Sequence, residues 1–404
     1  MNQKTKVLQI SNRFIIGGPS IILTILHAHL GENFISKLLV GKKEPHEEDA
    51  KFLLHAQGVS CEEIPSMNRT VNPISDLKAY YQIKKIIKSF KPQIVHTHAA
   101  KPSVLGRLAA HFNNVPVVLH TYHGHVFHNY FGKITTFFVI GLERFLTKFT
   151  SKIIAISEQQ KEELVNIYKI CKADKVVVIP LGLDLSPFYT DQPQKRIEFR
   201  KKFDIKDDEI VIAIIGRLVA VKNHTLFISA ISEVLINTTK KIRVLIVGDG
   251  DERINLIRQL DKLKIPFNYH PDDKNNKLVT LTSWLTKMDE VYAGVDIVAL
   301  SSLNEGTPVA LIEAQAACKP IVTTDVGGIR DIILKNETAF CVPSNEVKTF
   351  SASLCQLIEN DELRLKMGKK GYIHVKNNFD KSIFLHNTRT LYIKLLKEKG
   401  IEYI

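Results

Sequence analysis

The fold of this chain is decided by the stretch Ser301-Ser302-Leu303-Asn304-Glu305-Gly306-Thr307-Pro308-Val309-Ala310-Leu311-Ile312-Glu313-Ala314. The apolar run at residues 295–300 before it predicts a buried β-strand. The run at residues 309–317, rich in Ala, Leu and Glu, predicts a helix that ends before Lys319-Pro320. We expect Thr307 to be the N-cap of this helix. Pro308 is expected at its first position, where no backbone N–H is needed.

The loop between this strand and this helix is expected to bind an anion. The first amide groups of a helix lack partners within it and carry partial positive charge, so phosphate often binds there. Glu305 in the loop and Glu313 in the second helical turn would repel phosphate, so we expect them to accept hydrogen bonds from hydroxyl groups. A sugar nucleotide, with phosphates in the middle and hydroxyls at both ends, fits this arrangement. The alternative is that both glutamates are ordinary surface charges.

Length and composition set the broad class of the protein. A chain of 404 residues, 45% hydrophobic and 24% charged, is expected to form a globular protein of two domains. The net charge of +13 favours an anionic partner, which could be a nucleotide, nucleic acid or an acidic membrane surface. Five scattered cysteines without a CxxC pair indicate free thiols in a reducing cytosol. Residues 1–6 lead into an expected strand, and no apolar run approaches the roughly 20 residues that span a bilayer, so we expect a cytoplasmic protein without a signal peptide.

Strands and helices alternate along the first half of the chain, which predicts an α/β fold with a doubly wound parallel sheet. The first strand is expected at residues 7–10 and the first helix at residues 21–30. Gly17-Gly18 lies between them, where glycines would let a ligand approach the backbone closely. A plain tight turn explains this pair equally well.

Histidines are concentrated at the ends of two expected strands: His96, His98, His120, His123, His125 and His128. His96 and His98 would share one face of their strand, which could suit a zinc ion. The alternative is a crevice lined by histidines without metal. In such a crevice His123 could donate to a sugar hydroxyl or stabilise developing charge.

Residues 127–152 mix aromatic side chains with lysine and arginine. This pattern is typical of an interfacial helix that contacts anionic lipid. A core helix with a solvated basic face is the alternative.

A second alternation begins after residues 189–209, which we interpret as a linker with a short helix. A strand at residues 210–215 precedes Gly216-Arg217 and Lys222. Guanidinium can bind phosphate oxygens with two parallel hydrogen bonds, and lysine adds a point charge, although both could be solvated surface groups. Asp249-Gly250-Asp251 follows the next strand and is interpreted as a turn, with a Mn²⁺ or Mg²⁺ site as the alternative. Residues 267–279 are expected to form a protruding loop.

These motifs together resemble family 4 of the retaining GT-B glycosyltransferases. The residues that carry the resemblance are Gly216-Arg217 with Lys222, Val247-Gly248-Asp249-Gly250, Ser302 with Glu305 and Glu313, and Asp325-Val326-Gly327-Gly328. The resemblance implies two Rossmann-like, doubly wound domains that face each other across a cleft. Residues 1–188 would bind the acceptor and residues 189–382 the nucleotide-sugar, with a C-terminal helix at residues 383–404 packing back on the first domain.

The resemblance also implies roles for individual residues. Arg217 and Lys222 would neutralise the donor diphosphate, and Glu313 would bind ribose hydroxyls. Glu305 would lie beside the transferred sugar, next to Gly306, Thr307 and Pro308. From the first domain, Gly17-Gly18 would approach the diphosphate and His123 would contact the sugar, and no metal or other cofactor would be required.

The chain departs from the family pattern at several positions. Ser283-Trp284 stands where Gly-Trp is frequent, Cys318 and Ala339 stand where glycine is usual, and Leu181 stands where asparagine is often found. None of these departures removes a charged residue of the expected site, so we expect an active enzyme.

The sequence therefore predicts a retaining glycosyltransferase. It would move a hexose or N-acetylhexosamine from a nucleotide-diphosphate sugar, expected to be a UDP-sugar, to a glycan or lipid-linked acceptor in polysaccharide or lipopolysaccharide biosynthesis. The expected location is the cytoplasm, with peripheral contact to the inner face of an anionic membrane. The alternatives are a nucleotide-sugar epimerase on the same fold and a basic nucleic-acid binder. The second alternative lacks a recognisable nucleic-acid motif, so no nucleic-acid partner is expected.

Overall fold

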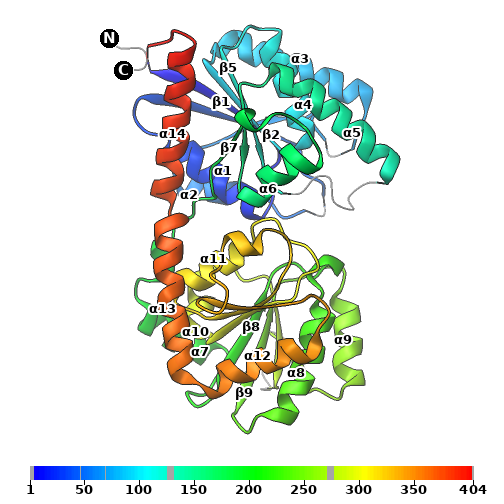
Figure 1. Ribbon diagram of the computed structural model, residues 1–404, viewed down its shortest axis with the longest axis vertical. Helices are drawn as coiled ribbons and strands as arrows, with labels where there is room; N and C mark the ends of the chain where they lie inside the picture. Colours follow the sequence, from blue (N-terminus) through cyan, green and yellow to red (C-terminus); the bar gives the residue numbers. More distant parts are fainter. Residues whose placement is uncertain (1–3, 46, 69, 125–131, 271–276, 403–404) are drawn as a thin grey trace. The chain divides into compact units, whose positions relative to one another are not determined.

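The computed structural model describes residues 4–45, 47–68, 70–124, 132–270 and 277–402. The chain forms two compact units (Figure 1). The N-terminal unit comprises Met1–Leu183 together with Phe379–Ile404, and the C-terminal unit comprises Asp184–Asn378.

Within the described residues, the N-terminal unit has a seven-stranded sheet in the order β3-β2-β1-β4-β5-β6-β7, with parallel pairing between neighbours. The strands are β1 (Thr5–Arg13), β2 (Phe34–Gly41), β3 (Glu62–Ile64), β4 (Ile94–His98), β5 (Val117–Tyr122), β6 (Lys152–Ala155) and β7 (Val176–Val178). Every residue of β4 and β5 is buried, as expected for central strands that are covered on both faces.

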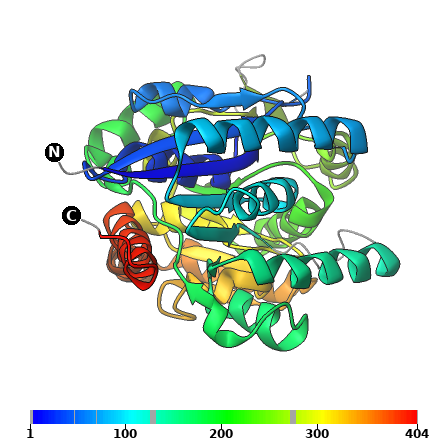
Figure 2. The same ribbon diagram turned by 90° about the horizontal axis from the view of Figure 1, so that it is seen from above.

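Helices lie on both faces of this sheet (Figures 1 and 2). They are α1 (Gly18–His29), α2 (Lys51–Ala56), α3 (Pro73–Phe90), α4 (Ala100–His111), α5 (Lys133–Leu146), α6 (Glu158–Glu162) and α14 (Lys381–Glu398). Helix α1 begins three residues earlier than the sequence predicts, directly after Gly17. Pro19 explains the early start, because proline suits the first turn of a helix.

The C-terminal unit also has a seven-stranded sheet within its described residues, but its strand order differs on one side, where β11 lies between β9 and β10. Its seven described strands have the order β10-β11-β9-β8-β12-β13-β14 and are also parallel. They are β8 (Ile210–Ile215), β9 (Ile242–Val247), β10 (Phe267–Tyr269), β11 (Val279–Ser283), β12 (Ile297–Leu300), β13 (Ile321–Thr324) and β14 (Ala339–Val342). The helices are α7 (Gln192–Lys202), α8 (His224–Asn237), α9 (Arg253–Lys262), α10 (Met288–Gly294), α11 (Val309–Ala316), α12 (Val347–Glu359) and α13 (Asp361–Asn378).

Each sheet has a switch point, from which successive strands are added on opposite sides, between β1 and β4 in one sheet and between β8 and β12 in the other. Open parallel sheets bind ligands at such a switch point, outside the carboxyl ends of the strands. Gly17-Gly18 follows β1, and Arg217 with Lys222 follows β8. The loop containing Glu305 follows β12. Most of the expected site residues therefore lie in loops at the switch points, beyond the carboxyl ends of the strands.

The short helix expected within residues 189–209 is present as α7, whose side chains Phe199 and Arg200 are buried. One sequence expectation about a loop is corrected by the structure. The region expected as a protruding loop begins with strand β10, which pairs with β11 at the edge of the sheet. Residues 271–276 of that region lie outside the described residues.

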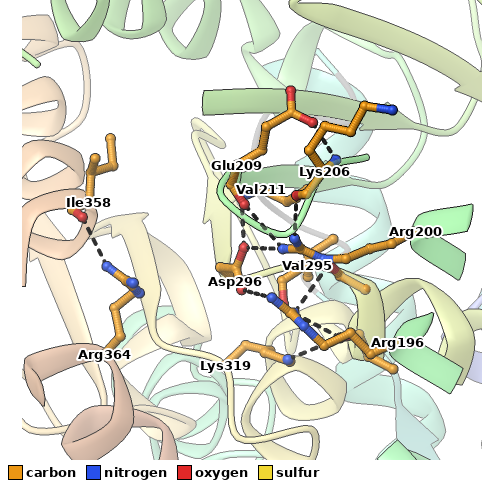
Figure 3. A network of polar contacts seen from close by, with 12 residues as sticks. Arg196, Arg200, Lys206, Glu209, Val211, Val295, Asp296, Lys319, Ile358 and Arg364 are labelled. Carbon is orange, nitrogen blue, oxygen red and sulfur yellow. Dashed lines mark hydrogen bonds and ion pairs between the residues drawn. The ribbon is translucent and has the colours of Figure 1, made fainter. Parts of the chain in front are cut away.

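Ionic contacts, rather than a broad apolar face, anchor α7 to the sheet (Figure 3). The carboxylate of Asp296 accepts hydrogen bonds from Arg196 at 2.8 Å, from Arg200 at 2.7 Å and from the backbone N–H of Val211 at 2.8 Å. Lys319 lies beside this network, where burial and the nearby Arg196 charge lower its pKa to about 8. This explains why a helix with so polar a sequence belongs to the C-terminal unit.

The chain leaves and re-enters the N-terminal unit at one place. The N–H of Leu183 donates to the carbonyl of Phe379 at 2.8 Å, and the N–H of Lys381 donates to the carbonyl of Leu183 at 2.8 Å. A β-carbon on Gly182 would lie 2.1 Å from the β-carbon of Phe384, so only glycine fits there.

None of the described helices has both the length and the apolar character that a bilayer-spanning helix needs.

Candidate active site

Lys222 and Glu305 meet at the switch point of the C-terminal sheet. The Nζ of Lys222 lies 2.6 Å from Oε1 of Glu305, and the two side chains are 21% and 10% exposed. The hydroxyl of Ser302 donates to the same carboxylate oxygen at 2.5 Å. A lysine and a hydroxyl therefore fix the orientation of this carboxylate.

The loops that carry these two residues are also joined through their backbones. The hydroxyl of Ser301 contacts the carbonyls of Lys222 and Asn223 at 3.0 and 2.9 Å. The N–H of Leu303 donates to the carbonyl of Val221 at 2.8 Å. Residues 83 positions apart in the chain are thus held together by the pairing of β8 with β12.

The Gly327-Gly328 pair supports the loop that contains Glu305. A β-carbon on Gly327 would lie 1.9 Å from the Glu305 carbonyl oxygen, and one on Gly328 would lie 2.0 Å from the Gly306 carbonyl oxygen. The N–H of Gly328 donates to the Glu305 carbonyl at 3.0 Å. These glycines let two loop backbones pack directly on each other.

Gly248 and Gly250 support the loop after β8 in the same way. Their β-carbons would lie 2.0 Å from the Gly216 carbonyl oxygen and 2.4 Å from the Leu218 carbonyl oxygen. Asp249 lies in the turn that the sequence predicts. Its carboxylate accepts hydrogen bonds from the N–H of Gly250 at 2.8 Å, from Arg253 at 3.1 Å and from Ser283 at 3.1 Å.

Arg217 is exposed, and its side chain forms no hydrogen bond or ion pair with any residue in the described part of the chain. An arginine held at a strand end without a protein partner is available to a ligand, and its guanidinium matches phosphate oxygens well.

The helix after the Glu305 loop begins at Val309, at the start of the predicted run, but its N-cap lies one residue later than the sequence predicts. Pro308, with φ −70° and ψ 104°, is the N-cap of α11, and Thr307 is not. The expectation for Thr307 was wrong because Pro308 adopts extended backbone angles instead of helical ones. The hydroxyl of Thr307 is buried and has no partner among the described residues. It lies beside the N-terminus of α11, whose first amide groups have no partner within the helix.

Glu313 keeps part of its surface accessible, and its carboxyl is held in a poorly solvated position. Burial raises its pKa to about 7, and a hydrogen bond with the hydroxyl of Tyr292 opposes this increase. The Tyr292 hydroxyl also lies 2.9 Å from the carbonyl oxygen of Ala310, which competes with Glu313 for its single proton. At neutral pH Glu313 can therefore exchange hydrogen bonds with a hydroxyl group either as acceptor or as donor.

Gly17, Gly18 and His123 belong to the N-terminal unit. Gly17 has φ 157° and precedes α1, and a β-carbon there would approach nothing closer than 3.9 Å. The space before this helix N-terminus is therefore open at the backbone, as a close approach by a ligand requires.

His123 follows β5, and its Nε2 lies 2.9 Å from Nδ1 of His98 at the end of β4. His96 and His98 do share one face of β4, with ring centroids 4.1 Å apart. The described residues contain no group of three or more His, Cys, Asp or Glu side chains arranged to hold a metal ion. His125 and His128 lie outside the described residues.

Sequence reasoning missed the structural partners of the expected site residues. They are Ser301, which joins the two loops, Tyr292, which contacts Glu313, and His98, which contacts His123. The adjacent serines at a strand end were a usable indication, because hydroxyls there can bind loop carbonyls. Nothing in the sequence indicated Tyr292.

The chain resembles known proteins along most of its length. Residues 37–187 match the family model "Glycosyltransferase Family 4", and residues 195–374 match "Glycosyl transferases group 1". The chain belongs to glycosyltransferase family 4. This family 4 glycosyltransferase is therefore an enzyme, and its fold is GT-B, as the sequence predicts.

One relative is the UDP-Gal:alpha-D-GlcNAc-diphosphoundecaprenol alpha-1,3-galactosyltransferase of Escherichia coli. It is 29% identical over 338 residues, which are 83% of this chain and 84% of that protein. The glycosyltransferase CapM of Staphylococcus aureus, of capsular polysaccharide biosynthesis, is 26% identical over 338 residues, or 82% of this chain and 84% of that protein. Among solved structures, HepE of Anabaena in complex with UDP matches this family 4 glycosyltransferase with a TM-score of 0.79 and 18% identity, covering 96% of this chain and all of that one.

Proposed function

We propose that this family 4 glycosyltransferase is a retaining enzyme that transfers a hexose or N-acetylhexosamine from a UDP-sugar. The acceptor would be a lipid-linked glycan of polysaccharide or lipopolysaccharide biosynthesis. The main support is the 2.6 Å contact of Lys222 with Glu305 at the switch point, on the same loops that carry Arg217 and lead into α11. The E. coli relative, whose name gives UDP-Gal as donor and a diphosphoundecaprenol as acceptor, supports the substrate class.

In this proposal, positive groups stabilise the departing diphosphate. Arg217 binds its oxygens, Lys222 adds a second charge, and the amide groups at the N-terminus of α11 contribute partial positive charge. Gly306, Thr307 and Pro308 let the donor approach that terminus. Gly17-Gly18 offers amide groups from the N-terminal unit. These groups supply the charge that a metal ion would otherwise provide, so we propose that the enzyme needs neither a metal nor another cofactor.

The carboxylates and the histidine act on the sugars. Glu305 lies beside the transferred sugar and stabilises positive charge that develops at its anomeric carbon. Glu313 binds the ribose hydroxyls, and His123 contacts the sugar. Retention would follow if the acceptor attacks from the face that the diphosphate leaves.

We further propose that the enzyme works in the cytoplasm, at the inner face of an anionic membrane. Helix α5 supports this because Phe137 and Phe138 are 70% and 69% exposed, and Leu142 and Phe145 are also exposed. Bulky apolar side chains on one surface helix, on a protein of net charge +13, suit the interface of anionic lipid.

The test is transfer from a panel of UDP-, GDP- and ADP-sugars to a synthetic polyprenyl-diphosphate N-acetylhexosamine, with the anomeric configuration of the product read by NMR. We expect an α-linked product from a UDP-sugar without added metal and in the presence of EDTA. Inversion would disprove the retaining mechanism. Epimerised donor in the absence of acceptor would favour the epimerase alternative, and RNA binding without a UDP-induced thermal shift would favour a nucleic-acid binder.

A further inference from the structure

The two histidines at the carboxyl ends of β4 and β5 form a pair. The Nδ1 of His98 and the Nε2 of His123 are 2.9 Å apart, and the rings stack with centroids separated by 5.1 Å. His98 is only 2% exposed. The opposite nitrogens, Nε2 of His98 and Nδ1 of His123, are buried and have no partner in the described part of the chain. Buried polar atoms nearly always have a partner, so both nitrogens are expected to meet a ligand or a water molecule.

The ring of His96 also lies against the ring of His98. Their centroids are 4.1 Å apart. The Nδ1 of His96 lies 2.7 Å from the hydroxyl of Tyr392, and its Nε2 lies 2.7 Å from the hydroxyl of Thr121. Because both nitrogens of His96 are occupied, its ring cannot rotate freely, and it restricts the movement of the neighbouring His98 ring.

The protonation states of Nε2 of His98 and Nδ1 of His123 depend on each other. Burial lowers the pKa of His123 to about 4 and the pKa of His98 well below its usual value, so both rings are neutral near pH 7. A neutral imidazole carries one ring proton. If Nδ1 of His98 donates, Nε2 of His123 accepts, and the proton of His123 lies on Nδ1. If the bond runs the other way, Nδ1 of His123 is bare and Nε2 of His98 is protonated.

We propose that His98 is a positioning residue for His123. Through its Nδ1–H it fixes the ring orientation and the tautomer of His123, so that the Nδ1–H of His123 is presented to an oxygen atom of the bound sugar. This inference rests on the proposed function, in which His123 contacts the sugar. The additional points are that Nδ1–H of His123 contacts the sugar and that His98 selects this tautomer.

The tautomer can be measured without any activity. NMR of the protein labelled with ¹⁵N-histidine, with His123 assigned by comparison with His123→Asn, should show a protonated Nδ1 and an unprotonated Nε2 on His123. A proton on Nε2 of His123, or rapid exchange between the two tautomers, would overturn the proposal. The tautomer of His123 is measured in the wild-type protein, so the result tests the proposal even if a His98 variant is unstable.

Kinetics of two His98 variants test the positioning role. His98→Leu removes the donor and should lower kcat by roughly ten- to a hundredfold, with little change in the KM for the donor, as expected for loss of a group that orients a functional histidine. His98→Asn keeps an amide donor near the Nδ1 position and should recover most of the rate. His27→Asn is the matched control, because His27 belongs to the same unit and bonds Ser36 and Ser60.

Equal rates for His98→Leu and wild type, or equal losses in His98→Leu and His98→Asn, would contradict the inference. A wild-type protein that transfers no sugar from any nucleotide donor would instead refute the proposed function. In that case the NMR result still decides the tautomer.

Discussion

The ammonium group of Lys222 lies 2.6 Å from the carboxylate of Glu305. The two residues are far apart in the sequence and meet because β8 pairs with β12. An ion pair at this position neutralises the carboxylate until a ligand arrives. A donor diphosphate would compete for the lysine, so binding of the donor and the state of Glu305 are linked.

We expect Lys222→Ala and Glu305→Ala each to lower the transfer rate at least about a hundredfold, the typical cost of removing a group that stabilises developing charge. The fold should survive with a lower melting temperature, because the pair is only 21% and 10% exposed and removing one partner leaves the other charge mostly buried, at a cost of up to about 3–5 kcal/mol. Transfer assays and thermal melting check both expectations. Lys206→Ala, which breaks an exposed pair with Asp204, is the control and should keep wild-type activity. Wild-type turnover by both site variants would show that the site is assigned wrongly.

Glu313 should make stability depend on pH. Its pKa of about 7 exceeds the 4.5 of an ordinary glutamate, so the folded state binds this proton more tightly than the unfolded chain. Its stabilising contribution is therefore complete below about pH 4.5 and is lost as pH rises through 7, by roughly 1–3 kcal/mol. Urea unfolding at pH 5 and pH 8 should show this loss in wild type and a smaller one in Glu313→Gln. Glu362→Gln, an exposed position, should behave like wild type. An unchanged pH dependence in Glu313→Gln would contradict the prediction.

Gly328 tests the packing beneath Glu305. Gly328→Ala would place a β-carbon 2.0 Å from the Gly306 carbonyl oxygen, so the backbone must move. We expect a loss of about 2 kcal/mol in the free energy of unfolding and weaker UDP binding by calorimetry. Gly141→Ala in α5 meets nothing within 4 Å and should be neutral or stabilising. If Gly328→Ala bound UDP as wild type does, the glycine pair would not support the donor site.

Cys318 occupies the position after α11 that usually holds glycine. Its φ is 57°, and the N–H groups of Cys318 and Lys319 donate to the carbonyls of Gln315 and Ala314, the pattern of a left-handed helix end. Cys318→Gly should therefore stabilise the fold by about 1 kcal/mol, measured by urea unfolding. Ala317→Gly, one residue earlier at φ −85°, should destabilise it. Destabilisation by Cys318→Gly would contradict this account.

Helix α5 provides the test of membrane contact. Replacing both Phe137 and Phe138 by Ser should release the protein from vesicles of anionic lipid in a sedimentation assay, because burying each ring in lipid contributes about 1.5–3 kcal/mol. The variant should remain folded, since both rings are exposed. Replacing the exposed Tyr81 and Leu77 of α3 is the control. Equal binding of both variants and wild type would argue against α5 as the contact surface.

The sequence allowed the α/β class and the loops at the strand ends to be predicted because continuous apolar runs and glycine-rich turns are local features. It did not reveal contacts that depend on strand pairing. His98 meets His123 because β4 and β5 pair with His98 opposite Thr121, a register that no local pattern specifies. The sequence indicated a short helix where α7 lies, but not how it is held, because Arg196 and Arg200 bind Asp296, about a hundred residues away.

The backbone hydrogen bonds of Leu183 with Phe379 and Lys381 have a practical consequence. The segment Asp184–Asn378 starts and finishes at neighbouring points, which makes it an insertion within the rest of the polypeptide. Such a segment can be removed as one piece, or exchanged for the corresponding segment of a relative with another nucleotide preference. Only two junctions in the chain need to be changed, and they lie close together in space.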